Sequence, residues 1–192
     1  MTQPRRDSEK LSVLVAAERD NQVDSLLREL RRTASHVIHL FPVMDRLPTE
    51  HDVILADFNL ALSDLLPWVP GEATTALILL LPENGQYSLR KLRDCCPDAV
   101  LHRPFKPDAI QASLVLARSQ FQFIRRLRSR IARLDENIKA IRDIERAKII
   151  IMDARRVGED EAYAYLRSQA MERRTTVASY ASHLVDSHQM LG

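Results

Sequence analysis

Short apolar runs and segments of helical periodicity alternate along the first hundred residues of the chain. The apolar runs cover residues 11–16, 37–41, 53–56, 76–81 and 99–101. Most of them are unbroken, whereas a strand with one wet face would alternate apolar and polar positions. This pattern therefore predicts strands that are buried on both faces of a parallel sheet.

Helical segments fill the gaps between these runs. Residues 21–32 place Val23, Leu26, Leu27 and Leu30 on one face, and residues 89–95 and 107–116 predict two further helices. Strands that alternate with helices give a parallel sheet with helices on both faces. We expect an α/β flavodoxin-like fold with a five-stranded parallel sheet.

A different pattern follows in residues 116–144, which contain neither proline nor glycine. Apolar residues recur there in alternating steps of three and four, at Ile124, Leu127, Ile131, Leu134, Ile138 and Ile141. This is the a/d spacing of a coiled coil. The stripe is narrow and arginines flank it, so we expect it to pair with a second copy of the chain. A single long helix packed on its own domain is the alternative.

The last fifty residues predict three amphipathic helices. The stripe continues through residues 141–155, so the coiled-coil helix is expected to run into the tail and to end at Arg156-Val-Gly158. Gly158 is an acceptable N-cap, and the acidic residues 159–161 suit the positive end of a helix dipole. The second helix, to about Glu172, turns Ala162, Leu166 and Ala170 inward, and the third, from Thr175 or Thr176, turns Val177, Tyr180, Ala181, Leu184 and Val185 inward. Short helices with one apolar stripe each are stable only when packed together.

Charge is distributed unevenly between the two parts. The net charge of +2 alone argues against a dedicated nucleic-acid binder. Residues 119–192, however, hold 14 Lys and Arg against 10 Asp and Glu, whereas the earlier part holds 14 against 16. The basic excess lies on the rod and tail, where a polyanion can bind.

Other features limit the class of protein. No apolar run has the length of a membrane span, and the start MTQPRRDSEK lacks the apolar core of a signal peptide. The two cysteines, Cys95 and Cys96, are adjacent, which suits neither a metal site nor an ordinary disulfide and fits a reducing cytoplasm. Glycine is too scarce for a phosphate loop, and no nucleophile, base and orienting group come together. We expect a cytoplasmic protein without metal, cofactor or enzymatic activity.

Residues 10–118 resemble a response-regulator receiver domain. The resemblance rests on Asp57, within Ile54-Leu-Ala-Asp-Phe-Asn59, and on Arg103-Pro104-Phe105. In that family the aspartate accepts a phosphoryl group, helped by an acidic pair that binds magnesium, a hydroxyl and a lysine. Here the acidic pair aligns with Ala17 and Glu18, the hydroxyl position falls near Leu80, and Arg103 replaces the lysine. These departures from the family pattern indicate a pseudo-receiver kept as an interaction surface, with phosphorylation of Asp57 as the alternative.

The tail, residues 142–185, resembles the ANTAR domain, the RNA-binding module of bacterial antiterminators. The residues that carry the match are Ala147-Lys148, Met152, Glu161-Ala162, Leu166-Arg167, Ala170-Met171, Arg173 and Ala181. The family usually has a small residue at Ile149 and a glycine at Arg156. Arg156 therefore either adopts a left-handed conformation, at a cost of about 1 kcal/mol, or the turn is built differently.

The order of the parts resembles the AmiR type of ANTAR-domain transcription antiterminator. It gives a polar leader at 1–9, a pseudo-receiver at 10–118, a coiled-coil dimerisation helix at 119–141 and an ANTAR domain at 142–192. The resemblance implies a homodimer that binds leader mRNA stem-loops and is held inactive by a cytoplasmic ligand-sensing protein that resembles a solute-binding protein. A two-component response regulator, activated by phosphorylation at Asp57, is the alternative.

Basic residues of the tail are the predicted RNA contacts: Arg142, Lys148, Arg155, Arg167, Arg173 and Arg174. Arg173 and Arg174 also suit a helix C-terminus without binding anything, and Lys148 could pair with Glu145. The tail has only Tyr163, Tyr165 and Tyr180 as aromatic residues, so charge and shape are expected to matter more than stacking. DNA is a less favoured target, because the third helix offers mainly Ser179, Ser182 and His183 for base readout.

Overall fold

The computed structural model describes residues 11–43, 46–58, 62–69, 71–85 and 87–191, so the predicted leader, 1–9, lies outside the described residues. The chain forms two compact units that divide between Arg125 and Arg126. The domain boundaries predicted above stay predictions. Across the described ranges, no helix combines the length and the apolar character needed to cross a bilayer.

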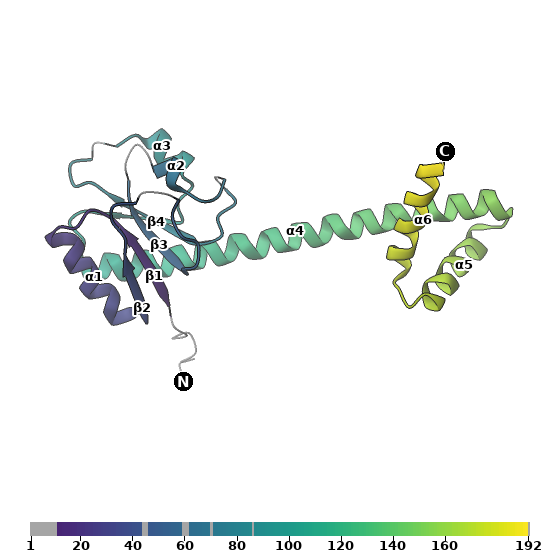
Figure 1. Cartoon of the computed structure of the whole chain (residues 1–192), viewed down its shortest axis with the longest axis horizontal. Coiled ribbons are helices and arrows are strands. Elements are labelled where there is room, and N and C mark those ends of the chain that lie inside the picture. The colour runs from purple at the N-terminus through teal and green to yellow at the C-terminus, as the bar shows by residue number, and fades with distance from the viewer. Residues whose placement is uncertain (1–10, 44–45, 59–61, 70, 86, 192) are drawn as a thin grey trace. The chain divides into compact units, whose positions relative to one another are not determined.

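A five-stranded parallel sheet is the centre of the first unit (Figure 1). Its strands are β1 (Ser12–Ala16), β2 (His36–His39), β3 (Val53–Asp57), β4 (Ala76–Leu81) and β5 (Ala99–His102). They are ordered β2-β1-β3-β4-β5, and every neighbouring pair is parallel. This is the flavodoxin-like order, so the predicted fold class is confirmed.

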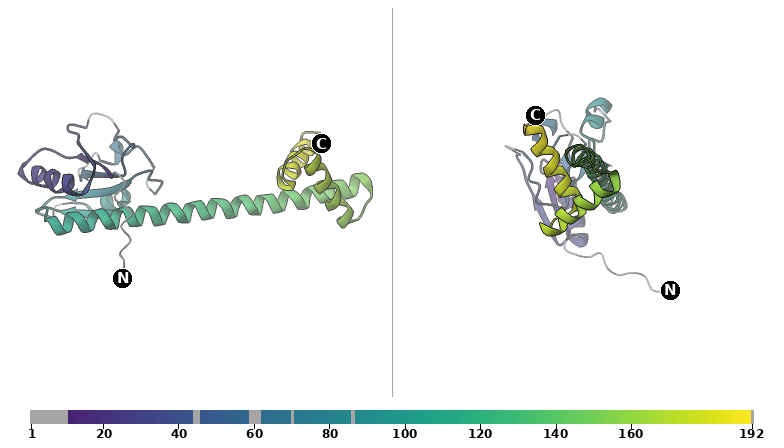
Figure 2. Two further views of the ribbon diagram at one scale, coloured as in Figure 1. Left: turned by 90° about the horizontal axis from the view of Figure 1, so that it is seen from below. Right: turned by 90° about the vertical axis from the view of Figure 1, so that its right-hand side faces the viewer.

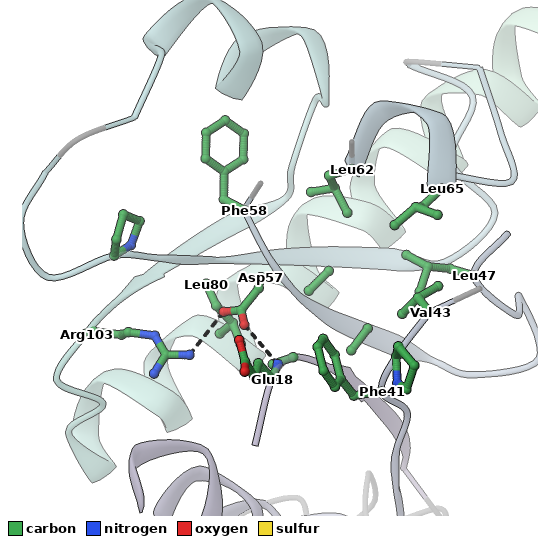
Figure 3. A pocket seen from close by; sticks show the side chains of 15 residues that line it. Glu18, Phe41, Val43, Leu47, Asp57, Phe58, Leu62, Leu65, Leu80 and Arg103 are labelled. Atoms are coloured by element: carbon green, nitrogen blue, oxygen red, sulfur yellow. Dashed lines mark hydrogen bonds and ion pairs between the residues drawn. The ribbon is translucent and has the colours of Figure 1, made fainter. Parts of the chain in front are cut away.

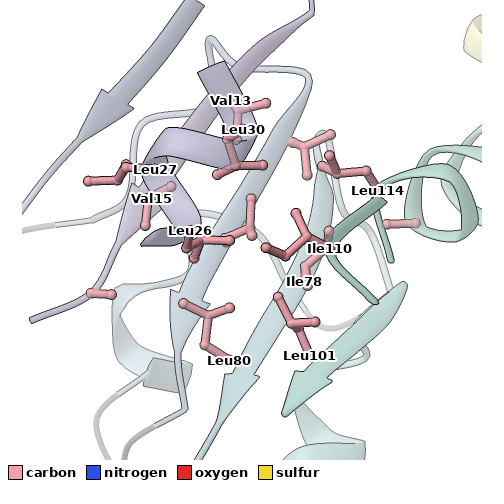
Figure 4. Packing of buried hydrophobic residues seen from close by; sticks show 14 of the residues in the cluster. Val13, Val15, Leu26, Leu27, Leu30, Ile78, Leu80, Leu101, Ile110 and Leu114 are labelled. Carbon is pink, nitrogen blue, oxygen red and sulfur yellow. The ribbon is translucent and has the colours of Figure 1, made fainter. Parts of the chain in front are cut away.

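Helices cover both faces of this sheet. Helix α1 (Asn21–Thr33) and the first turns of α4 (Pro107–Arg155) lie on one face, where Leu26, Leu30 and Ile110 pack against strand residues such as Ile78 (Figure 4). The short helices α2 (Leu62–Leu65) and α3 (Leu89–Asp94) lie on the other face. The sequence did not predict α2, because four residues are too few to show a helical period.

Helix α4 continues from the coiled-coil segment into the tail, as expected, and it also includes the helix 107–116 that the sequence predicted separately. It runs for 49 residues without interruption, through the expected helix 107–116, the coiled-coil segment and the first tail helix. Within one chain its apolar stripe is largely uncovered: Leu127 is 38%, Ile131 58%, Leu134 60%, Ile138 47% and Ile141 61% exposed. Large apolar side chains at a/d spacing are normally covered by a second helix.

The second unit contains the C-terminal part of α4, α5 (Glu159–Glu172) and α6 (Val177–Leu191). Figures 1 and 2 show α5 and α6 beside the last turns of α4. The buried core includes Ala147, Ala162, Ala170 and Ala181, whose small side chains let helix backbones approach closely, together with Leu166.

Backbone conformation and capping residues define the two turns of this unit. Arg156 has φ 56°, so it adopts the left-handed conformation that was one of the two expectations. Gly158 is the N-cap of α5, as predicted. The Thr176 hydroxyl accepts a hydrogen bond from Ser179 N–H (3.1 Å), which caps the first turn of α6.

Candidate functional site

A pocket of about 480 Å³ lies at the carboxyl ends of β1 and β3 (Figure 3). Its lining is mainly apolar and includes Phe41, Leu47 and Leu62. The charged side chains in the lining are Glu18, Asp57 and Arg103. Ligands of open α/β sheets bind at this edge, and the predicted phospho-acceptor Asp57 lies in it.

Both carboxylate oxygens of Asp57 have hydrogen-bond partners. The backbone N–H of Glu18 donates to Oδ2 at 3.2 Å, and Arg103 Nη2 donates to Oδ1 at 3.2 Å. The Arg103 side chain is only 15% exposed and the Asp57 side chain 27%. Figure 3 shows the guanidinium and the carboxylate pointing toward one another.

Arg103 also forms an ion pair with Asp20, the residue just before α1. Burial works to lower the pKa of Arg103, but the hydrogen bonds and charges of Asp57 and Asp20 outweigh it and raise the pKa. For Asp20, burial works to raise the pKa, and the N–H of Val23 together with Arg103 outweighs it and lowers the pKa. One cation thus pairs with two carboxylates.

This arrangement differs from the set of groups that phosphoryl transfer requires. A magnesium ion would need oxygen ligands free of a competing cation, whereas here a guanidinium contacts Asp57 and Asp20. Among the described residues no group of three or more His, Cys, Asp or Glu side chains is arranged to hold a metal ion. Leu80 lines the pocket where the hydroxyl was expected.

Lys148 is a buried cation of the tail core. Its side chain is only 10% exposed, and Nζ contacts Glu145 (2.8 Å) and Glu159 (2.5 Å). The hydrogen bonds with Glu145 and Glu159 raise the pKa of Lys148, and the hydrogen bond with Lys148 lowers the pKa of Glu159. Lys148 therefore ties α4 to the first turn of α5, and its predicted RNA contact stays a prediction.

Two of the predicted RNA-binding arginines pack over tyrosine rings. The guanidinium of Arg155 lies 3.7 Å from the ring centroid of Tyr165, and that of Arg173 lies 5.1 Å from that of Tyr180. Cation–π contacts of this kind connect the helices of the tail. Both arginines are nevertheless exposed to solvent.

The other three predicted RNA-binding residues, Arg142, Arg167 and Arg174, are exposed. In the described part of the chain none of their side chains makes a hydrogen bond, an ion pair or a ring contact. Such side chains can pair with a phosphate without first leaving a partner in the described part of the chain.

The comparisons with known proteins match both units. The ANTAR domain model matches residues 132–185, and the AmiR N-terminal model matches residues 11–118, more than half of the chain. The chain belongs to the AmiR family of ANTAR-domain antiterminators. This family consists of regulators of transcription antitermination that bind RNA.

Two curated relatives show how far the likeness of this AmiR-family protein extends. It is 29% identical over 113 residues to the transcriptional regulatory protein PdtaR of Mycobacterium tuberculosis, an alignment that covers 58% of this chain and only 55% of PdtaR. It is 24% identical over 181 residues to the aliphatic amidase regulator of Pseudomonas aeruginosa, covering 92% of this chain and 91% of that protein. Among solved structures, the response regulator StyR is similar at 15% identity and a TM-score of 0.48, covering 93% and 99% of the two chains.

Sequence reasoning missed two residues of this AmiR-family protein. Asp20 was overlooked as the second partner of Arg103, although its place directly before a predicted helix marks it as an N-cap. Glu159 was read only as a helix-dipole residue, whereas it also pairs with Lys148 eleven positions earlier. A contact across a turn between two helices leaves no periodic signal.

Proposed function

We propose that this protein is a dimeric RNA-binding antiterminator that a ligand-sensing partner protein controls, rather than phosphorylation of Asp57. The observation that carries the proposal is the ANTAR match over residues 132–185, in which Arg142, Arg167 and Arg174 are exposed cations whose side chains have no partner among the described residues. The protein acts as a regulator and not as an enzyme.

The proposed mechanism uses two copies of the tail. Pairing of the α4 stripes brings two tail units together on one dimer, and each tail binds one stem-loop of a nascent leader mRNA. Binding of two linked loops raises the overall affinity without any new contact. The bound stem-loop competes with the terminator hairpin, and transcription continues.

The proposed RNA surface has two groups of residues. Arg142, Arg167 and Arg174 contact phosphates directly, since no side-chain partner within the described ranges holds them. Arg155 and Arg173 contribute charge while they stack on Tyr165 and Tyr180. Lys148 contributes indirectly, because its ion pair with Glu159 fixes the first turn of α5. An RNA phosphate contacts Lys148 only if that ion pair opens.

The contacts of the Asp57 carboxylate favour control by a partner protein over control by phosphorylation. Its carboxylate is already bonded by Arg103 and by the Glu18 N–H, so a phosphoryl group would displace the guanidinium. A cytoplasmic solute-binding-like sensor that covers the dimer and releases it on binding ligand needs no change at Asp57.

Binding to leader RNA is the direct test of this function. Labelled transcripts of the untranslated leader next to the gene are titrated with the full chain, and duplex DNA of the same sequence serves as the competitor. We expect saturable binding to the RNA hairpins that weakens steeply with salt and that duplex DNA does not displace. Equal affinity for the duplex would favour a DNA-binding tail instead.

Phosphorylation of Asp57 is the second candidate mode of control. Labelled acetyl phosphate with magnesium, applied to the wild type and to Asp57→Asn, separates the two modes. We expect no stoichiometric incorporation into either protein. Magnesium-dependent labelling of the wild type that is lost in Asp57→Asn would establish a phosphorylated response regulator.

A further inference from the structure

One flank of α5 carries an exposed aromatic ring next to an exposed cation. Tyr163, Arg167 and Met171 follow one another at steps of four, which places them along one side of the helix. Tyr163 is 46% exposed and Met171 is 70% exposed. The helix buries Ala162, Leu166 and Ala170 in the tail core instead, so the fold does not need this flank.

The three tyrosines of the tail differ in what surrounds them. Tyr180 is buried to 9% exposure beside Arg173, and Tyr165 lies under the guanidinium of Arg155. The side chain of Tyr163, by contrast, makes no hydrogen bond, ring contact or cation–π contact with any residue that the structure describes. It is the tyrosine of the tail whose ring face is open to a ligand.

Charge decides which ligand fits this flank. Arg167 on α5 and Arg174, just beyond its C-terminal end, have no counter-ion among the residues that the structure describes. An apolar protein surface would leave them buried and unpaired. Single-stranded RNA supplies both things that the flank lacks, a flat base for the ring and phosphates for the guanidinium groups. Asp160 lies one turn before Tyr163, in the acidic first turn of α5, so the proposed RNA-binding flank ends there.

We propose that Tyr163 stacks on an unpaired base of the RNA hairpin loop, while Arg167 and Arg174 contact the adjacent phosphates and Met171 packs against the same loop. This inference rests on the proposed RNA-binding function and names the part of the tail that touches the bases. Stacking then contributes substantially to affinity, contrary to what the small number of aromatic residues predicted.

The test uses the full chain and a pool of tandem RNA hairpins with randomised loops. The wild type selects the tightest RNA from the pool, and 2-aminopurine is then placed at each loop purine, since its fluorescence falls when it stacks. Tyr163→Phe keeps the ring, whereas Tyr163→Leu and Tyr163→Gln remove it at an exposed helix position. Phe123→Leu, at a 52% exposed aromatic residue of α4, is the matched control.

We expect Tyr163→Phe and Phe123→Leu to bind like the wild type and to quench one loop base. Tyr163→Leu and Tyr163→Gln should bind about 5- to 100-fold more weakly, without that quenching and with an unchanged salt slope. Arg167→Ala should instead reduce the salt slope by about one. Thermal unfolding, followed by circular dichroism, should be the same for all of these variants.

Two results would overturn the inference, and they are distinguishable. If the wild type binds an RNA and both ring-deleting variants bind it equally well with the same quenching, the stacking contact is absent while the proposed function stands. If the wild type selects no RNA from the pool, the proposed function fails, and the stacking contact fails with it.

Discussion

At the scale of single residues, Asp20 uses one carboxylate for two purposes. It caps α1 by accepting a hydrogen bond from Val23 N–H at 2.7 Å, and it forms an ion pair with Arg103. The same Arg103 holds Asp57, so three segments of the chain meet at one cation. These ion pairs thereby hold the edge of the sheet together.

Asp20→Asn separates these two contributions. Asparagine caps a helix about as well as aspartate, so the substitution removes mainly the ion pair. Because the Asp20 side chain is 46% exposed, we expect a loss of about 0.5–1 kcal/mol in the free energy of unfolding at neutral pH.

The pH dependence of this loss follows from the lowered pKa of Asp20. A carboxylate with a lowered pKa stabilises the folded protein fully above the pKa of the unfolded chain, and this stabilisation is lost as the pH falls through the folded pKa. Urea unfolding should therefore show the wild type and Asp20→Asn converging in acid. A difference that stays constant with pH would contradict the ion pair.

Lys148 and Arg167 are two tail cations in contrasting environments: Lys148 is buried in ion pairs, whereas Arg167 is exposed. Lys148→Met should lower the thermal midpoint of the protein, because Glu145 and Glu159 lose their shared partner. Arg167→Ala should leave the midpoint unchanged and weaken hairpin binding. Circular dichroism and fluorescence anisotropy measure the two quantities. The reverse outcome, with a stable Lys148→Met that binds no RNA, would place Lys148 in direct contact with the RNA.

At the scale of elements, the turn between α4 and α5 stores local strain. Arg156 has φ 56°, a region that glycine adopts without a steric penalty. We expect Arg156→Gly to increase the free energy of unfolding by about 0.5–1 kcal/mol, since relief of strain exceeds the added flexibility of the unfolded chain. Arg155→Gly, one residue earlier and inside the helix, is the control and should be destabilising. Urea unfolding that ranks Arg156→Gly below the wild type would contradict this reading of the turn.

Strands and amphipathic helices of this protein are predictable from the sequence, because their burial repeats with a regular period. Val53 to Ala56 is an apolar run because both faces of β3 are covered, and Ala162, Leu166 and Ala170 line one face of α5. The contacts of Lys148 and Asp20 are not predictable in the same way. Asp20 and Arg103, for example, are 83 positions apart along the chain. Only the folded topology brings such residues together in space.

The candidate RNA surface was only partly predictable. Residue type and family resemblance pointed to six cations. The structure divides them by environment into one buried lysine, two stacked arginines and three arginines whose side chains have no partner in the described part of the chain. The exposed ring of Tyr163 was not predicted, because sequence spacing alone does not show which of two tyrosines, two positions apart, is covered.

At the scale of the whole molecule, the uncovered stripe of α4 has the form of a dimer interface. Ile138→Asp should weaken dimerisation roughly a hundredfold or more, because a carboxylate would be buried between two helices. Ala132→Asp adds the same charge at an exposed position outside the a/d stripe and should leave the dimer intact. Sedimentation equilibrium across a range of concentrations measures both. Equal association constants for the two variants would show that the stripe is not the interface.

The central claim is that paired α4 helices present two tail units to two hairpin loops of one RNA. The most direct measurement compares the affinities of the wild type and of Ile138→Asp for a tandem-hairpin transcript and for each hairpin alone. We predict that the wild type prefers the tandem RNA by about a hundredfold and that Ile138→Asp shows no preference. A monomeric protein that binds the tandem transcript with full affinity would contradict the account.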